Sequence, residues 1–504
     1  MPRYREMPHN PDQLWLLPPS LDELVGDDCD VRLLNEVMNH LDWSILESDC
    51  LGAGRPCYPP KVMAKILIYA YSKGIRSSRR IEELTRCDVR YMWLTGGHKP
   101  DFHTIAKFRK DNFDEFAKLF ADSVRVCKAS GLVPLNVVSV DGTKVIANAS
   151  KASMYNDKRV DREIEAVERI LREAEEADNA EDALYGDGNG SIIPDDLKDA
   201  KKRREKLKEI AAKLKASKSK SISSSDDECR MMKTRNGVRP AYNVQAAVDS
   251  KHQIIVAAKV VQGEHDHRQL ADMLVEVKNN TGLDCCLVLA DTGYCDEATL
   301  LALNESGQEA LIPPEKHSQE SKRNDLFCSR CFVADDNRDV LICPAGRELT
   351  RRNDVKGGSG TYKRYRASGC GSCSMRSECV NGKGSREVRV SIVADLRDKM
   401  VRGLKSPAGK EVYRLRGETV EPVFGQVKHD RKLDRLYLNG INGAEAEVML
   451  AFLAHNLLKC ARWGLGGALS AILKRMIDAV AQLFVKIMNM FRVADILCPE
   501  ALQY

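Results

Sequence analysis

Hydrophobic positions in the first 130 residues recur at the spacing of amphipathic helices. The segment YPPKVMAKILIYAYSKGI has two prolines where a helix would begin and Gly74 where it would end. SSRRIEELTRC follows, with a serine at the N-cap position and Glu82 placed for a capping box. After a break at GGHKP another helical segment begins. We therefore predict a helical domain over residues 1–130, with helix, short turn and helix in the order of a helix-turn-helix module.

From residue 137 the pattern becomes that of buried strands. In VVSVDGTKVIANAS an apolar run is interrupted by one carboxylate, Asp141, and a glycine follows it. AYNVQAAVDS and HQIIVAAKVVQ predict two further strands joined by a short turn, and RQLADMLVEVKNN predicts a helix. DCCLVLADTGYCD predicts a strand that ends on Asp291, and residues 409–460 return to a helical pattern. This order of elements predicts an α/β core over residues 135–460.

Two long segments interrupt this core. In residues 155–228, dense charge with apolar positions three and four residues apart predicts an antiparallel helical hairpin or short coiled coil, followed by a flexible linker rich in serine and lysine. Residues 313–395 are predicted to be rich in loops and to lack a hydrophobic core of their own. The tail, residues 465–504, predicts one or two apolar amphipathic helices for packing or oligomerisation.

Length and composition limit the class of protein. A chain of 504 residues predicts two or three domains, and 43% hydrophobic with 30% charged residues is typical of a soluble globular protein. The sequence opens without the apolar segment of a signal peptide, and its longest apolar stretch, VMLAFLAHNLL, is too short to span a bilayer. We therefore expect a cytoplasmic protein with no membrane partner, whose 17 cysteines are reduced thiols or metal ligands. A net charge of +5 permits a nucleic-acid partner without indicating one.

Basic residues on the predicted N-terminal helices are candidates for contacts to DNA phosphates. The pattern places six of them on the outside: Arg76, Arg79, Arg80, Lys107, Arg109 and Lys110. A helical bundle with solvated charges explains these residues equally well, so the pattern alone does not decide between the two. The basic run at residues 201–204 could also contact DNA, although a solvated helix face is the simpler interpretation.

Asp141 and Asp291 are candidate catalytic residues because each interrupts or closes an apolar strand. Adjacent strands can aim two carboxylates at one point, and oxygen ligands suit Mg²⁺ or Mn²⁺. Glu421 stands on the apolar side of a predicted helix, where an acid is costly without cationic partners. Lys428 follows seven residues later on the same face and could reach a DNA phosphate. A third acid would complete a two-metal site for phosphodiester cleavage, with ions about 3.5 to 4 Å apart.

The element order, strand with Asp, two strands, helix, strand with Asp and helix with Glu, is that of a ribonuclease H-like fold. VDGTKVIANAS, LADTGYCDEATL and YRLRGETVEPVFGQVK resemble the first-Asp, second-Asp and Tyr-Arg-Glu-Lys segments of the DDE transposases of bacterial insertion sequences. Residues 54–97, with PDFHTIAKFR after them, resemble the helical N-terminal domain of one large group of these transposases. The resemblance covers about residues 15–460 and implies a ribonuclease H-like α/β core that carries both insertions.

The resemblance also implies an enzyme that cuts double-stranded DNA at the terminal inverted repeats of its element and joins the freed 3′-OH to target DNA, without a covalent protein–DNA intermediate. The residues that would hold two Mg²⁺ or Mn²⁺ ions are Asp141, Asp291 and Glu421. Lys428 and Arg416 would bind phosphate, and Tyr413 corresponds to the tyrosine of the signature. Arg416 stands one residue further from Glu421 than in the commonest pattern, so Arg414 is an alternative to it.

Bringing two DNA ends together implies at least a homodimer, and DNA binding implies a place at the nucleoid. Two other functions are compatible with the same residues. One is a ribonuclease H-like nuclease that cleaves without strand transfer, and the other is a catalytically degenerate transposase retained as a DNA-binding protein. A purely structural alternative is that the three acids only cap turns.

The cysteines of the second insertion are a candidate metal site. Two C-x₂-C pairs about 40 residues apart could close a tetrahedral zinc site. The thiols proposed for it are Cys343, Cys370, Cys373 and Cys379, with Cys328 and Cys331 as the other pair; reduced free thiols are the alternative. EHDHRQL also resembles a metal site through His265 and His267, but Asp266 is better explained as the N-cap of the next helix. His455 and Asn456, within an apolar helix, are predicted to form a hydrogen-bonded core pair.

Overall fold

The computed structural model describes residues 19–46, 57–185, 195–217, 219–314, 331–335, 338–357, 360–380 and 384–463. The chain divides into two compact units, Met1–Glu115 with Leu457–Tyr504, and Phe116–Asn456. The helical tail predicted over residues 465–504 lies outside the described residues. Within the described ranges, no helix is long and apolar enough to cross a lipid bilayer.

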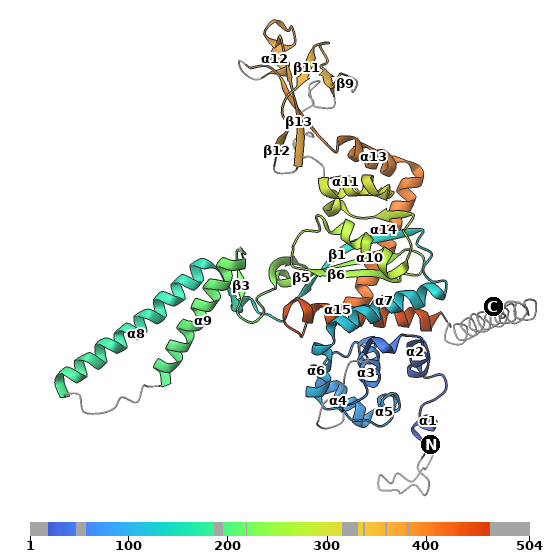
Figure 1. Ribbon diagram of the computed structural model, residues 1–504, viewed down its shortest axis with the longest axis vertical. Coiled ribbons are helices and arrows are strands. Elements are labelled where there is room, and N and C mark those ends of the chain that lie inside the picture. Colours follow the sequence, from blue (N-terminus) through green and yellow to red (C-terminus); the bar gives the residue numbers. More distant parts are fainter. Residues whose placement is uncertain are drawn as a thin grey trace, which may run out of the picture. The chain divides into compact units, whose positions relative to one another are not determined.

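The first unit is helical, as predicted (Figure 1). Its described elements are α1 Leu21–Leu24, α2 Asp30–Met38, η1 Trp43–Leu46, α3 Pro60–Ser72, α4 Ser78–Cys87, α5 Val89–Thr95 and α6 Phe102–Asp111. Pro60 opens α3, and Gly96 ends α5 in the left-handed conformation at φ 60°. The capping box predicted for Glu82 was wrong. Its carboxylate instead accepts a hydrogen bond from the Phe102 amide at 3.0 Å, because the start of α6 packs beside α4.

The second unit is a mixed α/β fold built on a six-stranded sheet (Figure 1). The strands of this sheet are β1 Val137–Ile146, β4 Arg230–Thr234, β5 Gly237–Asp249, β6 Ile255–Val261, β7 Leu287–Leu289 and β8 Ala310–Leu311. Their order is β4-β5-β1-β7-β8, and β6 also pairs with β5. The pairs β1–β5 and β5–β6 are antiparallel, whereas β1–β7 and β7–β8 are parallel.

Helices cover this sheet and complete its core. They are α7 Phe113–Ala129, α10 Gln269–Thr281, α11 Glu297–Ser306, α13 Ala394–Lys405, α14 Pro407–Gly425 and α15 Gly440–Arg462. α10 packs against β5 and β6, and α14 packs against β1 and β5. The predicted core pair on α15 is confirmed. Asn456 bonds both the amide and the carbonyl of Ile255, at 3.0 and 2.9 Å, and His455 Nε2 lies 2.9 Å from the Gln253 carbonyl.

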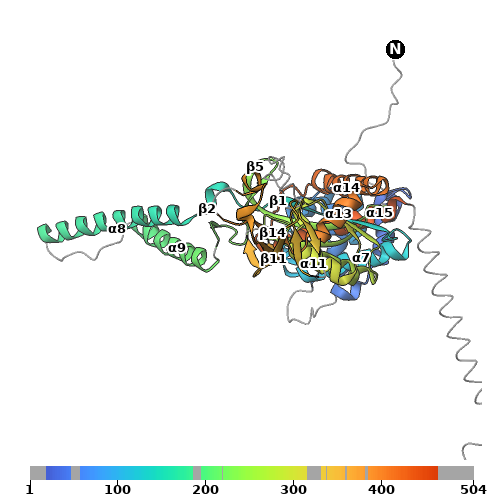
Figure 2. The same ribbon diagram turned by 90° about the horizontal axis from the view of Figure 1, so that it is seen from above.

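The first insertion contains the two predicted helices, α8 Asp157–Tyr185 and α9 Asp195–Ser217, which lie side by side (Figures 1 and 2). Val160 of α8 belongs to one buried cluster with Ile210 and Leu214 of α9. The linker predicted to be flexible contains a short strand, β3 Ile222–Ser223, which pairs with β2 Met154–Tyr155. This strand pairing places Ile222 in the buried cluster formed by Val160, Ile210 and Leu214. The apolar contact explains why part of the linker is a strand, although its serine- and lysine-rich composition favours a coil.

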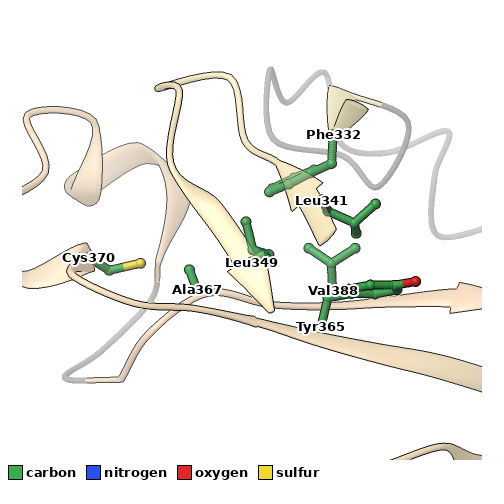
Figure 3. Close-up of a cluster of buried hydrophobic side chains, with 7 residues drawn as sticks. All are labelled: Phe332, Leu341, Leu349, Tyr365, Ala367, Cys370 and Val388. Atoms are coloured by element: carbon green, nitrogen blue, oxygen red, sulfur yellow. The ribbon is translucent and has the colours of Figure 1, made fainter. Parts of the chain in front are cut away.

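The second insertion has its own sheet and its own core, so the prediction of a coreless, loop-rich segment was wrong. Its strands are β9 Val333–Asp335, β10 Val340–Ile342, β11 Glu348–Arg351, β12 Val355–Gly357, β13 Gly360–Ala367 and β14 Glu387–Ser391. The buried side chains in Figure 3 are Phe332, Leu341, Leu349, Tyr365, Ala367, Cys370 and Val388. These strands are short, and charged residues such as Arg366 flank the buried positions. The alternation of apolar and polar residues that marks a strand is therefore hard to recognise in the sequence.

Candidate active site

Asp141 and Asp291 lie at the same level of two adjacent parallel strands. Asp141 is within β1, and Asp291 follows β7 and caps the short helix η3 Thr292–Tyr294. In the pairing of β1 with β7, Ser139 is opposite Leu289, and each aspartate comes two residues after that pair. Each carboxylate is oriented by a glycine amide, since Gly142 N donates to Asp141 Oδ1 at 2.9 Å and Gly293 N donates to Asp291 Oδ1 at 2.8 Å.

Arg416 of α14 brings a positive charge to both carboxylates. Its Nη2 atom lies 2.9 Å from Asp141 Oδ2 and 3.9 Å from Asp291 Oδ2. Burial raises the pKa of Asp141 to about 6, although Arg416 opposes the shift, and the negative charges of Asp291 and Asp266 add to it. Burial alone would lower the pKa of Arg416, but the neighbouring carboxylates outweigh burial and raise it. The site therefore holds a buried carboxylate that depends on a nearby cation to stay ionised.

Tyr413 supports the strand end that carries Asp291. Its hydroxyl donates to the Ala290 carbonyl at 3.2 Å, one residue before Asp291. Burial raises the pKa of the Tyr413 hydroxyl, so it remains a hydrogen-bond donor at neutral pH. Tyr413 and Arg416 thus lie three residues apart on α14, Tyr413 bonded to the residue before Asp291 and Arg416 close to both aspartates.

Glu421 also lies on α14, with an exposed side chain. Its negative charge adds to the raised pKa of Arg416, after the larger effects of Asp141, Tyr413 and Asp291. Among the described residues, no three His, Cys, Asp or Glu side chains are grouped so that they could hold a metal ion. The place of Glu421 beside the two aspartates therefore stays a prediction.

Lys428 lies in a π-helical turn, Gln426–Asp430, directly after α14. Its ammonium group donates to the Lys144 carbonyl of β1 at 2.7 Å. Burial lowers the pKa of Lys428 to about 8, and the positive charge of Arg235 adds to the effect. Lys428 is thus a cation held against the strand that carries Asp141.

Asp266 is the residue at this site that the sequence interpretation missed. The predicted N-cap role was wrong, because Arg268, at φ 63°, precedes α10 and Asp266 turns toward the sheet. Its Oδ1 atom accepts hydrogen bonds from Gln245 at 2.6 Å, Asn243 at 2.7 Å and Lys144 at 3.4 Å. Two polar residues on one buried face of β5 were the available signal, since buried amides need a partner.

The basic residues predicted to face outward on the helical unit divide into two kinds. Arg79, Arg80 and Lys107 are exposed. Arg109 and Arg76, only 4% and 3% exposed, are buried, so their predicted place on the outside was wrong. Arg109 follows the buried Ile105 by four residues on α6 and therefore shares its face. The sixth residue, Lys110, is also exposed. Of the exposed residues, Arg79 stacks 4.9 Å from the Phe102 ring and Arg80 pairs with Glu83 at 2.6 Å.

The four cysteines proposed for zinc lie near one another in the second insertion. Arg347 links their turns, because its amide donates to Cys343 Sγ at 3.3 Å and its guanidinium donates to the Ser372 carbonyl at 3.1 Å. Burial raises the pKa of Cys379, opposed by Arg386 and increased by the nearby thiols Cys370, Cys343 and Cys373. These thiols form no metal-binding group among the described residues, and Cys328 lies outside them. Zinc binding stays a prediction.

Two transposase family models match parts of this chain. Residues 342–461 match the family model of a transposase DDE domain, and residues 19–111 match that of a transposase domain, DUF772. A comparison with curated proteins gave no significant match. A solved structure, described as the cryo-EM structure of the piggyBac transposase synaptic complex with hairpin DNA, aligns over 90% of this chain and 81% of that chain. Its identity is 10% and its TM-score 0.29, too low to bear on the fold.

Proposed function

The chain belongs to the DDE-type transposases of the insertion-sequence kind, and we propose that it cuts DNA at the ends of its element and joins the freed 3′ ends to target DNA. The observation that carries this proposal is the pairing of Asp141 and Asp291 at one level of two parallel strands, with Arg416 between them. Strand ends hold carboxylates rigidly, which suits a site that must position a phosphodiester for in-line attack.

We infer that the main sheet and its helices form a ribonuclease H-like core over residues 135–460. The order β6-β5-β1-β7-β8, with an antiparallel half and a parallel half, supports this assignment. Residues 1–130 are then the DNA-binding domain, in which Arg79, Arg80 and Lys107 are the exposed cations proposed to contact phosphate.

The ions proposed for this reaction are Mg²⁺ or Mn²⁺, and Asp141, Asp291 and Glu421 would hold them. The donor set fits, because oxygen atoms of two carboxylates face a single positive group, Arg416 Nη2, at 2.9 and 3.9 Å. When bound, such ions supply Lewis-acid stabilisation of the charge that develops on phosphodiester oxygens.

The chain's own residues would prepare the site for DNA. The amides of Gly142 and Gly293 orient the two aspartates, and Tyr413 holds the carbonyl before Asp291. Lys428, which donates to the Lys144 carbonyl of β1, is proposed to bind a phosphate of the DNA, and Arg416 would share that role. We propose that at least two copies of the chain act in one complex, because two DNA ends must be brought together.

The direct test uses labelled duplexes that carry the DNA flanking the gene on either side, purified protein, and Mg²⁺, Mn²⁺ or EDTA. We expect metal-dependent cuts at the element ends and products joined to a target plasmid. Matched duplexes already nicked at the end, but ending in 3′-deoxy nucleotides, should not be joined. Cuts without joining would indicate a nuclease, and specific binding of the ends without cuts under either metal would indicate a degenerate DNA-binding protein.

The low pKa of Lys428 predicts a pH dependence of DNA affinity. Since its pKa is lowered to about 8, the free protein loses this positive charge as pH rises through that value. Affinity for end DNA should then fall toward tenfold for each pH unit above 8, the limit for one linked proton. Lys428→Arg keeps its charge and should flatten the decline. Binding curves between pH 7 and 9.5 check this, and identical curves for both proteins would contradict a phosphate contact by Lys428.

A further inference from the structure

A glycine directly follows Asp141 and another lies two residues after Asp291, and the Asp266 carboxylate lies near both. A Cβ atom added to Gly142 would lie 2.4 Å from Asp266 Oδ1 and 2.5 Å from Gln245 Nε2. One added to Gly293 would lie 3.0 Å from Asp291 Oδ1 and 3.6 Å from Asp266 Oδ2. The carboxylate of Asp266 therefore fills the space beside Gly142 with one oxygen, and its other oxygen lies at ordinary contact distance from the Cβ position of Gly293.

The same carboxylate is the centre of a partly buried hydrogen-bond network. Asn243 and Gln245, both fully buried on β5, donate to its Oδ1 atom. Gln245 also accepts a hydrogen bond from the Tyr294 hydroxyl of η3. Asn243 donates in addition to the Gly263 carbonyl at 3.1 Å. The network thus connects the central strands, the segment before α10 and the turn that follows Asp291.

The network also reaches the cations of the site. Lys144 on β1 lies 3.4 Å from Asp266 Oδ1, and its carbonyl accepts the hydrogen bond of Lys428. A carboxylate so near two others is costly to bury unless its charge has partners. Two amides and one ammonium provide those partners here. Removing the carboxylate would take away the acceptor that the two buried amides share, and Asn243 would keep its hydrogen bond to the Gly263 carbonyl.

We propose that Asp266 is a positioning residue of the DNA-cleaving site, which holds Gly142 and Gly293 so that their amides aim Asp141 and Asp291. The proposal rests on the proposed function for its catalytic consequence. Its physical basis is a chain of contacts, from Asp266 to the two glycines and from each glycine amide to the aspartate it orients. Misplacement of catalytic groups by about 1 Å can cost about 100-fold in rate.

The test compares Asp266→Ala and Asp266→Asn with Asp272→Asn. The last removes an exposed charge on the neighbouring helix α10 that pairs with Lys259 of β6 at 2.7 Å. Three quantities are measured: single-turnover cleavage of end DNA at saturating protein, affinity for the same DNA in EDTA, and hydrogen–deuterium exchange in peptides containing Gly142 and Gly293.

We expect Asp266→Ala to slow cleavage by about 100-fold and to speed exchange at both glycines, with DNA affinity unchanged. Asp266→Asn should recover part of the rate, because its oxygen still accepts from Gln245 and Asn243, and it carries the test if the alanine variant does not fold. Asp272→Asn should match the wild type in all three.

Wild-type cleavage and exchange in both Asp266 variants would overturn the proposal. So would a loss of DNA affinity and thermal stability in proportion to the loss of cleavage, which would indicate a merely structural role. If the wild-type protein itself never cuts the DNA, the proposed function fails, and exchange at Gly142 and Gly293 still decides whether Asp266 positions the aspartates.

Discussion

Asp141→Asn is expected to lower the rate of end cleavage by about 1,000-fold or more, equivalent to about 4 kcal/mol of transition-state stabilisation. The amide keeps the shape of the side chain and can still accept the Gly142 hydrogen bond, but it lacks the charge that Mg²⁺ or Mn²⁺ needs. Single-turnover cleavage of labelled end DNA measures the effect. Asp291→Asn and Glu421→Gln should show losses of the same order, because the proposed reaction needs all three acids.

Asp141→Asn should lose cleavage activity without losing thermal stability. The folded pKa of Asp141, about 6, lies above its ordinary value of 3.8, so ionisation of this group destabilises the fold as pH rises from about 4 to 6. At pH 8 the neutral amide removes that cost, and the melting temperature should stay the same or rise. Asp272→Asn is the matched control, since it removes an exposed carboxylate whose partner is Lys259 of β6. Wild-type cleavage by Asp141→Asn would contradict the assignment of the site.

Gly142→Ala is expected to reduce cleavage by about 100-fold and to lower stability by about 1 to 3 kcal/mol, the usual cost of forcing an extra carbon into a packed site. The new Cβ atom would lie 2.4 Å from Asp266 Oδ1 and 2.5 Å from Gln245 Nε2. Neither atom can move freely, because they are hydrogen-bonded to each other at 2.6 Å and Gln245 is fully buried. Cleavage kinetics and thermal unfolding measure the two effects.

Gly26→Ala is the control for this substitution. A Cβ atom at Gly26 would meet nothing within 4 Å, so cleavage and melting temperature should match the wild type. If Gly142→Ala behaved like Gly26→Ala, the close approach of Asp266 to β1 would be wrong, and the reason for glycine after Asp141 would have to be sought elsewhere.

Local pattern was sufficient for much of the fold. The apolar run before Asp141 and the run before Asp291 predicted β1 and β7, and the structure confirms both strands. Long helices with regular spacing, such as α8 and α14, were also recognisable, because a repeat of three and four residues persists over many turns. The short strands of the second insertion were not recognisable, because strands of three to eight residues with many charges show too little alternation of apolar and polar residues.

The exposure of a basic residue and the partner of an acid depend instead on how helices and strands pack against one another. Arg79 and Arg109 are both arginines on amphipathic helices, yet only Arg79 is exposed, because the packing of α6 turns Arg109 inward toward Tyr71. Asp266 precedes a helix and has the local signature of an N-cap, but the buried amides of Asn243 and Gln245 offer it stronger partners.

The sequence by itself determined the two strands that carry Asp141 and Asp291 and the helix that carries Arg416 and Glu421, because periodicity and strand ends are local properties. Only the tertiary structure decided that the two aspartates share one level of the sheet, with Arg416 between them and Asp266 beside their glycines. The physical reason is that strand register, helix docking and burial of charge are set by contacts between residues far apart in the chain, which no local spacing records.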